Sequence, residues 1–361
     1  MSAFDLDKRP WIVMVGGFLG AGKTTLLLAA ANELGKRGLR SAVILNDQGE
    51  DLVDTQYASL HDLQRGEIAG GCFCCRFSEL VRVIDRLKEF APEVIFSEPV
   101  GSCTDLSATT LKPLLEYRDR YRLAPFTVLV DPERARELLD PGADQHLKFL
   151  FDKQVKEADL LCFTKSDLGS TYPVSEDLGI DCGEIRQISA QTGQGVAAWL
   201  DEVLSGHISA GSRVLDIDYE EYARAEAALA WLNLRVSIQP TMPVSPAMLL
   251  GPLLDQLDAD FTTADISIVH LKAIMNSPTG FVKAAICRNG EPPSVEGDLA
   301  ASPASNHDLL LNLRALGSAP LVQEIVERNL EQMDGRLSDL RVSAFHPAPP
   351  KPERRIVDAG Q

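Results

Sequence analysis

The chain has 361 residues, a length that suggests two or three domains, and 45% of them are hydrophobic, which excludes wholesale disorder. The net charge of −17 argues against general binding to nucleic acid or to anionic membranes, because an acidic surface repels phosphate groups. No apolar run reaches the roughly 18 residues that span a bilayer, and residues 1–10 lack the apolar stretch of a signal peptide. We therefore expect a soluble, cytoplasmic protein.

The amino-terminal part of the chain, residues 1–206, alternates apolar runs with helical stretches. Strands are predicted over residues 11–18, 40–47, 93–100, 125–131, 159–165 and 184–190. Helices are predicted over residues 23–37, 78–90, 105–117, 144–157 and 195–204. Because strands that alternate with helices build parallel sheets covered on both faces, we predict an α/β fold with a doubly wound, mostly parallel sheet.

A different order of elements follows a candidate linker at residues 205–213. Helices are predicted over residues 219–230, 246–257 and 321–333, and strands over residues 232–238, 266–275, 281–287, 309–313 and 340–345. This order suggests a smaller α+β domain, at residues 215–345, with helices on one face of an antiparallel sheet. Residues 346–361 are rich in proline and charge and are predicted to form a loose tail.

The first motif is Gly17-Phe-Leu-Gly-Ala-Gly22-Lys23-Thr24, which matches GxxxxGK[ST] between a predicted strand and a predicted helix. Its glycines allow successive backbone N–H groups to surround phosphate oxygens, and the helix N-terminus adds partial positive charge. Lys23 would neutralise the β- and γ-phosphates, and Thr24 would offer its hydroxyl to Mg²⁺. The motif predicts a P-loop NTPase fold whose nucleotide-binding residues are Gly17, Gly20, Ala21, Gly22, Lys23, Thr24 and Thr25.

The second motif, Thr164-Lys165-Ser166-Asp167, follows a predicted strand and has the form of the guanine-reading element [NT]KxD. The Asp167 carboxylate can accept hydrogen bonds from guanine N1–H and the exocyclic amine, whereas adenine would leave it unpaired. The Lys165 stem can cover the base plane, and Ser189-Ala190 fits the supporting element that packs on the base. Thr164, Lys165, Asp167, Ser189 and Ala190 therefore predict GTP and GDP as ligands.

Acidic residues end two further predicted strands. Glu98, in Glu98-Pro-Val-Gly101, can order the Mg²⁺ water shell or the attacking water, and the Gly101 N–H can meet the γ-phosphate. Asp47, in Asn46-Asp-Gln-Gly-Glu50, is the other candidate for the Mg²⁺ shell or for a switch that senses the γ-phosphate. We predict a GTPase whose catalytic residues are Lys23, Asp47, Glu98 and Gly101.

Three of the seven cysteines fall within Gly70-Gly71-Cys72-Phe73-Cys74-Cys75. Three thiols in four residues can supply three soft ligands to one Zn²⁺ or similar ion, and a fourth ligand must then come from elsewhere. An open fourth position suits delivery of the ion, whereas a closed site suits a structural role. Buried small side chains and a redox thiol pair are the alternatives. The scattered cysteines are interpreted as core residues or inert thiols: Cys103, Cys162, Cys182 and Cys287.

These motifs, in this order, resemble those of the CobW-type metallochaperone GTPases, which are relatives of HypB and UreG. The resemblance extends over essentially the whole chain, because a smaller α+β C-terminal domain is also typical of that family. It implies slow GTP hydrolysis coupled to the binding of Zn²⁺ or Co²⁺ and to its delivery to a client metalloprotein. It also implies that Cys72, Cys74 and Cys75 bind the transition metal, with Glu50 as a further ligand.

The sequence departs from the family pattern in the switch segment, where Asn46-Asp-Gln-Gly-Glu50 replaces Asn-Glu-Phe-Gly-Glu and Leu45 replaces an acidic residue. The usual Glu-Thr/Cys-Ser/Thr-Gly reads Glu98-Pro-Val-Gly101, and a histidine-rich stretch is absent. Three alternatives stay open: an assembly factor for a cobalamin-dependent (corrinoid) enzyme, a metal- or redox-responsive binding module whose nucleotide is structural, and a small-molecule kinase. The sequence also leaves open the metal, the client and a homodimer.

Overall fold

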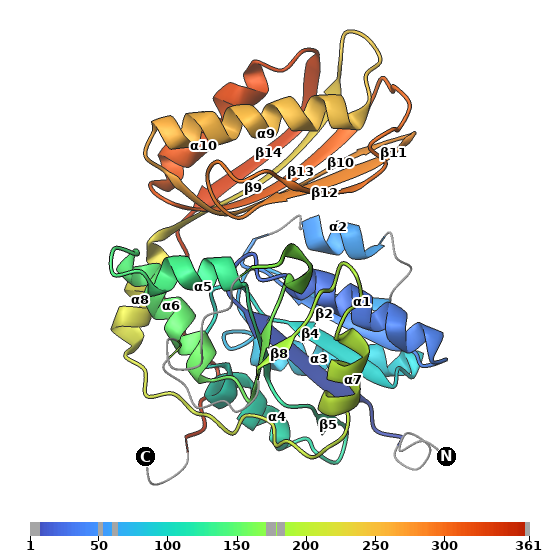
Figure 1. Cartoon of the computed structure of the whole chain (residues 1–361), viewed down its shortest axis with the longest axis vertical. Helices are drawn as coiled ribbons and strands as arrows, with labels where there is room; N and C mark the ends of the chain where they lie inside the picture. The colour runs from blue at the N-terminus through green and yellow to red at the C-terminus, as the bar shows by residue number, and fades with distance from the viewer. Residues whose placement is uncertain (1–7, 50–52, 60–63, 171–177, 179–184, 358–361) are drawn as a thin grey trace. The chain divides into compact units, whose positions relative to one another are not determined.

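The computed structural model describes residues 8–49, 53–59, 64–170, 178 and 185–357, which divide into two compact units (Figure 1). The first unit is formed from segments of residues 1–48, 58–225 and 349–361, and the second from residues 49–57 and 226–348. No helix in the described ranges is long and apolar enough to cross a lipid bilayer. Each unit has a sheet of its own.

A sheet of eight strands forms the centre of the first unit, in the order β3-β2-β4-β1-β6-β7-β8, with β5 paired to β1. Every pairing between these strands is parallel. The central strands consist of buried residues, as expected for strands that are covered on both faces. The strands are β1 (Trp11–Gly17), β2 (Ser41–Asn46), β3 (Gln64–Ile68), β4 (Val94–Glu98), β5 (Arg122–Leu123), β6 (Thr127–Val130), β7 (Leu160–Phe163) and β8 (Arg186–Gln187).

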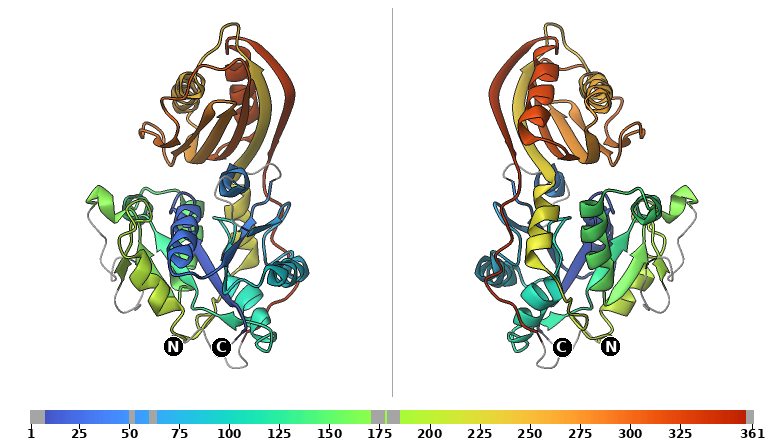
Figure 2. Two further views of the ribbon diagram at one scale, coloured as in Figure 1. Left: turned by 90° about the vertical axis from the view of Figure 1, so that its right-hand side faces the viewer. Right: turned by 90° about the vertical axis from the view of Figure 1, so that its left-hand side faces the viewer.

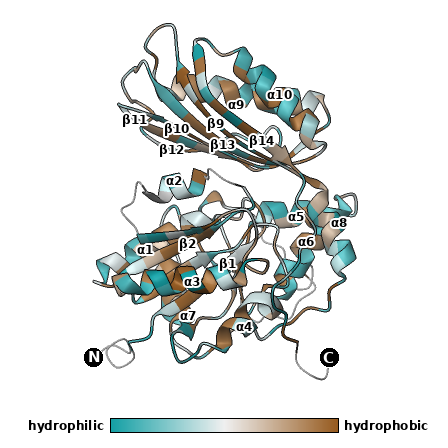
Figure 3. Cartoon of the chain, turned by 180° about the vertical axis from the view of Figure 1, so that it is seen from behind, coloured by the Kyte–Doolittle hydropathy of each residue, from teal (hydrophilic) through white to brown (hydrophobic). Residues whose placement is uncertain are grey.

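Helices cover both faces of this sheet, which confirms the predicted doubly wound α/β fold. α1 (Lys23–Lys36) and α7 (Val196–Val203) share a hydrophobic core with one face, and α3 (Phe77–Leu87) lies on the opposite side (Figure 2). The hydrophobic residues of α3 recur every three or four positions, so one side of the helix is buried and the other is hydrophilic (Figure 3). The remaining helices are α4 (Lys112–Leu115), α5 (Pro132–Leu139), α6 (Gln145–Lys156) and α8 (Tyr219–Ala227).

The structure also contains elements that the sequence did not predict. β3 was missed because four of its five residues are polar or glycine and only Ile68 is buried, as suits a strand at the end of the sheet. α5 was missed although its start carries a recognisable signal: Asp131 caps the helix by accepting from the Glu133 N–H, and Pro132 occupies the first turn. The single helix predicted over residues 105–117 is a π-helical turn, Ser107–Leu111, followed by α4.

The second unit is built on a six-stranded antiparallel sheet, in the order β12-β11-β10-β13-β9-β14. Two helices, α9 (Pro246–Thr263) and α10 (Ala319–Glu331), pack together on one face of this sheet (Figure 1). The α+β architecture predicted for the smaller part is therefore confirmed. The strands are β9 (Leu229–Gln239), β10 (Ser267–Ser277), β11 (Gly280–Ile286), β12 (Ser294–Gly297), β13 (His307–Leu316) and β14 (Arg336–Phe345).

A short segment from the amino-terminal half of the sequence is part of the second unit. α2 (Val53–Ser59) begins there, and the Val53 N–H donates to Asn312 Oδ1 at 2.9 Å. The Lys283 ammonium lies 3.6 Å from the centre of the Tyr57 ring, and the Tyr57 hydroxyl donates to Glu296. The chain that leaves the end of β2 therefore continues into contacts with the antiparallel sheet.

Candidate nucleotide and metal site

The predicted site residues follow the carboxyl ends of parallel strands, which meet at one edge of the first sheet. The P-loop follows β1, Asp47 follows β2, the thiol segment follows β3, Glu98 ends β4, and Thr164-Lys165 follows β7. Ser189 and Ala190 follow β8 at the same edge. The loops that carry the predicted site residues therefore follow strands of one parallel sheet, at its carboxyl edge, and Glu50 lies outside the described residues.

The P-loop turns through two glycines in the left-handed region, Gly20 at φ 83° and Gly22 at φ 87°, which side chains other than glycine rarely adopt. Gly22 is the N-cap of α1, and the first backbone N–H groups of a helix have no partners within the helix. The buried Lys23 ammonium donates to the Gly17 carbonyl at 2.9 Å. A charged group and a helix N-terminus that converge on one loop form an anion site.

Thr24 and Glu98 form a buried pair beside the P-loop. The Thr24 hydroxyl lies 2.8 Å from Glu98 Oε2 and 3.1 Å from Oε1, and both residues are only 5–6% exposed. A threonine hydroxyl and a carboxylate supply the oxygen ligands that Mg²⁺ prefers, directly or through water, so this donor set fits the ion. Gly101 comes next in the same loop, and a Cβ atom there would lie 3.0 Å from the Lys23 ammonium.

Gln154 on α6 holds the loop after β4, and sequence reasoning missed it. Its amide donates to the carbonyls of Gly101 and Cys103, at 2.9 Å each, although the residue is buried on an otherwise apolar side of the helix. The signal was present: Gln154 occupies the helical spacing of Leu147, Leu150 and Phe151, where a polar residue needs a buried partner.

The thiol segment forms a compact cluster at the carboxyl end of β3. Cys72 Sγ lies 2.7 Å from Cys74 Sγ and 3.2 Å from Cys75 Sγ, and the third pair is 3.7 Å apart. Cys72 and Cys74 are buried, and Cys75 is partly exposed. Three sulfur atoms that converge in this way match the soft ligand set of Zn²⁺ or Co²⁺, so the residues present fit such an ion.

The thiols of the cluster shift one another's pKa values. Cys103, interpreted from the sequence as a core residue or inert thiol, is buried as expected. Hydrogen bonds from Cys103, Cys74 and Cys75 lower the pKa of Cys72 well below its ordinary value. The hydrogen bond with Cys72 in turn raises the pKa of Cys75 to about 11, and the pKa of Cys74 is also raised. The cluster therefore stabilises one thiolate among neutral thiols.

Asn46, at the end of β2, connects the switch segment to the thiol segment and was not predicted as a site residue. Its amide donates to the carbonyls of Ile68 at 2.8 Å and Gly71 at 2.7 Å. Its oxygen accepts from the Phe73 N–H at 3.0 Å, and the neighbouring Asp47 N–H donates to Ile68 at 3.2 Å. The backbone on both sides of Gly71 is therefore held by the strand end that also positions Asp47.

The carboxyl-terminal segment, predicted as a loose tail, runs along the first unit and contacts the thiol cluster. The Lys351 N–H donates to Cys75 Sγ at 3.2 Å, and the Glu353 N–H donates to the Cys74 carbonyl at 2.9 Å. The Glu353 carboxylate also accepts from the Ser78 N–H at 2.9 Å. Backbone from the end of the sequence thus covers one side of the cysteines.

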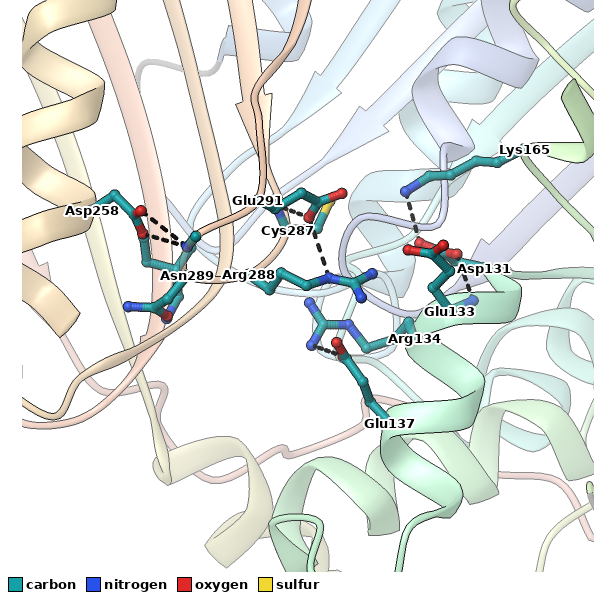
Figure 4. A network of polar contacts seen from close by, with 12 residues as sticks. Asp131, Glu133, Arg134, Glu137, Lys165, Asp258, Cys287, Arg288, Asn289 and Glu291 are labelled. Atoms are coloured by element: carbon teal, nitrogen blue, oxygen red, sulfur yellow. Dashed lines mark hydrogen bonds and ion pairs between the residues drawn. The ribbon is translucent and has the colours of Figure 1, made fainter. Parts of the chain in front are cut away.

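The predicted guanine-reading residues lie on the other side of the P-loop, at the ends of β7 and β8. Lys165 adopts a left-handed backbone conformation, φ 56°, and its ammonium lies 2.7 Å from Asp131 Oδ2 at the end of β6 (Figure 4). Asp167 is exposed, as a group that receives a base edge must be. Ser189 is buried, and its hydroxyl accepts from the Thr192 N–H at 3.1 Å, which fixes the adjacent loop.

The sequence of this domain matches the model of a known protein family. Residues 11–189 match the family model described as "CobW/HypB/UreG, nucleotide-binding domain". Residues 11–189 of this chain belong to that family. The matched range extends from β1 to the serine after β8, so it contains the P-loop, the thiol segment and the Thr-Lys-x-Asp element described above.

Individual relatives are similar over part of the chain. The zinc chaperone YjiA of Escherichia coli (strain K12) is 30% identical over 167 residues, which cover 44% of this chain and 49% of the relative. The zinc chaperone CobW of Pseudomonas aeruginosa is 29% identical over 190 residues, 45% of this chain and 50% of the relative. The chain therefore spans about half the length of these relatives. The comparison with the crystal structure of Zn(II)-bound YjiA GTPase from E. coli covers 90% of this chain and 99% of that one. The two sequences are 15% identical in this comparison, and the TM-score is 0.39.

Proposed function

We propose that the protein is a GTP-dependent metallochaperone, which binds Zn²⁺ or Co²⁺ at the thiol cluster and delivers it to a client metalloprotein. The observation behind this proposal is that a P-loop and a cluster of convergent cysteines lie at one edge of one sheet. Support comes from two relatives of the nucleotide-binding domain that are named zinc chaperones. A corrinoid enzyme is one class of client that cobalt would serve.

In this proposal the P-loop N–H groups and Lys23 bind the phosphates of GTP, and Asp167 and Lys165 select guanine. Mg²⁺, when bound, would neutralise phosphate charge, held by Thr24 with Glu98. Glu98 orients the attacking water, and the Gly101 N–H contacts the γ-phosphate that Lys23 binds. A Cβ atom on Gly101 would lie 3.0 Å from the Lys23 ammonium, so this part of the loop is next to Lys23. As the resemblance to CobW-type GTPases implies, we expect slow hydrolysis of GTP to GDP and phosphate.

The contacts of Asn46 support coupling between nucleotide and ion. Asp47 would respond to the γ-phosphate, and its neighbour Asn46 hydrogen-bonds to the backbone before and after Gly71, next to Cys72. By linkage, the ion must change GTP affinity by the factor by which GTP changes ion affinity. A typical coupling free energy of about 1–3 kcal/mol gives partial release of the ion, whereas nearly complete release of the ion needs about 5.5 kcal/mol. We propose that a client completes the transfer.

The second unit is our candidate for the client-binding surface. α2, which follows the switch segment in sequence, hydrogen-bonds and packs within that unit through Val53 and Tyr57. A rearrangement of the switch segment would therefore move a helix that contacts the antiparallel sheet. Binding of a client there would depend on the nucleotide for the same reason.

The decisive experiment is a titration of the protein with Zn²⁺ and Co²⁺ in the presence of either a non-hydrolysable GTP analogue or GDP. We expect ion affinities that differ by roughly 5- to 150-fold between the two nucleotides. Equal affinities would remove the coupled mechanism. A variant with Cys72, Cys74 and Cys75 all replaced by serine should lose both the bound ion and any stimulation of GTP turnover by the ion.

A binding module with a structural nucleotide is the second candidate, favoured by the one lowered pKa in the thiol cluster, which suits redox sensing. Lys23→Ala distinguishes the two candidates, because it removes the charge that contacts the γ-phosphate. The metallochaperone loses GTP turnover and nucleotide-dependent client binding together. In the binding module, Lys23→Ala makes GTP turnover negligible, but the variant still binds its partner.

A further inference from the structure

Residues 351–356, which we call the strap, follow the antiparallel sheet in sequence and lie along the first unit (Figure 2). The Lys351 N–H donates to Cys75 Sγ at 3.2 Å, and the Glu353 N–H donates to the Cys74 carbonyl at 2.9 Å. Cys75 is the one partly exposed member of the three clustered thiols, whereas the other two are buried. The strap therefore contacts the thiol through which solvent has access to the cluster.

Surface contacts hold the middle of the strap. The Glu353 carboxylate accepts from the Ser78 N–H at 2.9 Å and from the Ser78 hydroxyl at 2.6 Å. The Arg354 guanidinium lies 5.7 Å from the centre of the Phe77 ring and pairs with Glu116 at 2.7 Å. Because exposed ion pairs contribute little to stability, these contacts hold the strap only weakly.

The end of the strap has a buried anchor in the loop after β4. Arg355 Nε donates to Asp105 Oδ2 at 2.8 Å, and the Asp105 side chain is fully buried. The Tyr219 hydroxyl donates to the same oxygen at 2.7 Å, and the Ile356 N–H donates to the Ala108 carbonyl at 2.8 Å. A buried carboxylate is costly without a charged partner, so Asp105 binds Arg355 firmly.

The strap is therefore held firmly at Arg355 and weakly at Lys351, where one N–H meets a sulfur atom. Segments with few buried contacts open locally at a small cost in free energy. Residues 351–353 can lift from the thiols while Arg355 stays bound to Asp105, so the anchor keeps the strap in place to close again.

We propose that the strap is a cover that controls how fast the ion enters and leaves the thiol cluster, an inference that rests on the function proposed above. In the closed position, the Lys351 N–H supports the Cys75 sulfur as an ion ligand, and strap backbone separates the cluster from water and from competing chelators. When residues 351–353 lift, Cys75 becomes accessible to a ligand of the client. The transfer exchanges metal–sulfur bonds for bonds to that ligand, and no electron is transferred.

The test compares two adjacent arginines of the strap. Arg355→Ala removes the buried anchor, and Arg354→Ala, the matched control, removes a surface pair. The double variant Asp105→Asn with Arg355→Ala releases the strap without an unpaired buried charge, so it tests the proposal even if Arg355→Ala folds poorly. Stopped-flow mixing of each full-length protein with Co²⁺, and of each Co²⁺-loaded protein with the chelator EDTA, follows the sulfur-to-cobalt charge-transfer absorbance.

We expect ion entry and ion exit both to become roughly tenfold faster in Arg355→Ala and in the double variant, because the strap is open for more of the time. The rates of Arg354→Ala should stay within about twofold of the parent. Ion affinity should fall by less than the exit rate rises. Damage to the thiol site itself would speed exit but not entry, so the entry rate separates a cover from a merely structural segment.

Entry and exit rates equal to those of the parent in both anchor variants would overturn the proposal, as would faster exit with unchanged entry. Hydrogen exchange of the Lys351 and Glu353 amides is a second measurement. Faster exchange in Arg355→Ala with unchanged ion kinetics would show that the strap opens without any control of the ion, which also overturns the proposal. If the parent binds no Co²⁺ at the thiols, the proposed function fails as well. If the parent binds Co²⁺ and the anchor variants keep its rates, only the role of the strap fails.

Discussion

The carboxyl edge of the first sheet, which carries the predicted site residues, has two halves that differ in burial and in hydrogen bonding. On the β3-β2-β4-β1 side, the polar groups are buried and bonded between loops, as in the pair Thr24–Glu98 and in the contacts of Asn46. On the β6-β7-β8 side, Asp167 is exposed, and the Lys165 side chain pairs with Asp131. In the first half, hydrogen bonds join the P-loop to the end of β4 and the end of β2 to the thiol segment, whereas the second half has the exposed Asp167 for the base. A change on the base side should therefore leave the ion site intact.

The largest expected effect is a loss of guanine recognition without a change in ion binding. In Asp167→Asn, the amide loses an acceptor for the exocyclic amine of guanine, so GTP affinity should fall roughly 10- to 100-fold, which corresponds to about 1–3 kcal/mol. Xanthosine triphosphate carries a carbonyl where guanine carries that amine, so the asparagine amide can donate to it. The measurement is nucleotide binding by calorimetry, with Co²⁺ affinity measured on the same samples.

Recovery of affinity with xanthosine triphosphate is the control, because a misfolded variant would bind neither nucleotide. Co²⁺ affinity in the absence of nucleotide should equal that of the parent. A loss of ion binding in Asp167→Asn would show that the two halves of the edge are not independent.

The next effect concerns the buried half. Asn46→Ala removes three hydrogen bonds, one to the end of β3 and two to the thiol segment, and it leaves the Ile68 and Gly71 carbonyls without this partner. We expect Co²⁺ affinity to fall about tenfold, as for groups that support ion ligands, and the free energy of unfolding to fall by roughly 1–3 kcal/mol. Co²⁺ titration and urea unfolding measure the two quantities.

Asn289→Ala is the matched control for this loss. Asn289 lies in the second unit and also makes three side-chain hydrogen bonds, with Ile268, Thr262 and Ile266. It should lower the stability of its unit without a change in ion affinity. Equal ion affinity in Asn46→Ala and Asn289→Ala would contradict the role of Asn46 as the link between switch and thiols.

The same contrast explains which features the sequence predicts. The P-loop, Thr164–Asp167 and Cys72–Cys75 are local motifs whose spacing alone states their chemistry, and the buried strands follow from their apolar runs. β3 was missed because an edge strand needs few buried residues, and Gln154 and Asn46 were missed because their partners are distant in sequence.

The last prediction concerns Glu157, which lies behind the loop after β4 on the buried half of the edge. Its carboxyl is fully buried and accepts from the Ser107 N–H at 3.3 Å, and burial raises its pKa well above the ordinary value. The unfolded chain loses this proton near pH 4.3, whereas the folded protein keeps it to a higher pH. Stability therefore falls as the pH rises from the unfolded pKa to the folded pKa, by at most about 1.4 kcal/mol per pH unit for this group.

Glu157→Gln replaces the protonated carboxyl with an amide of similar shape that does not titrate. We expect little change in stability at pH 4, a gain over the parent that grows toward pH 8, and unchanged affinities for GTP and Co²⁺. Urea unfolding at several pH values measures this, with Glu202→Gln as the control, because Glu202 is a half-exposed acid on α7 paired with Arg186. If both variants kept the pH slope of the parent, Glu157 would be ionised in the folded state. The buried half of the edge would then tolerate a negative charge behind its nucleotide loop, and its contrast with the exposed half would be weaker than the structure indicates.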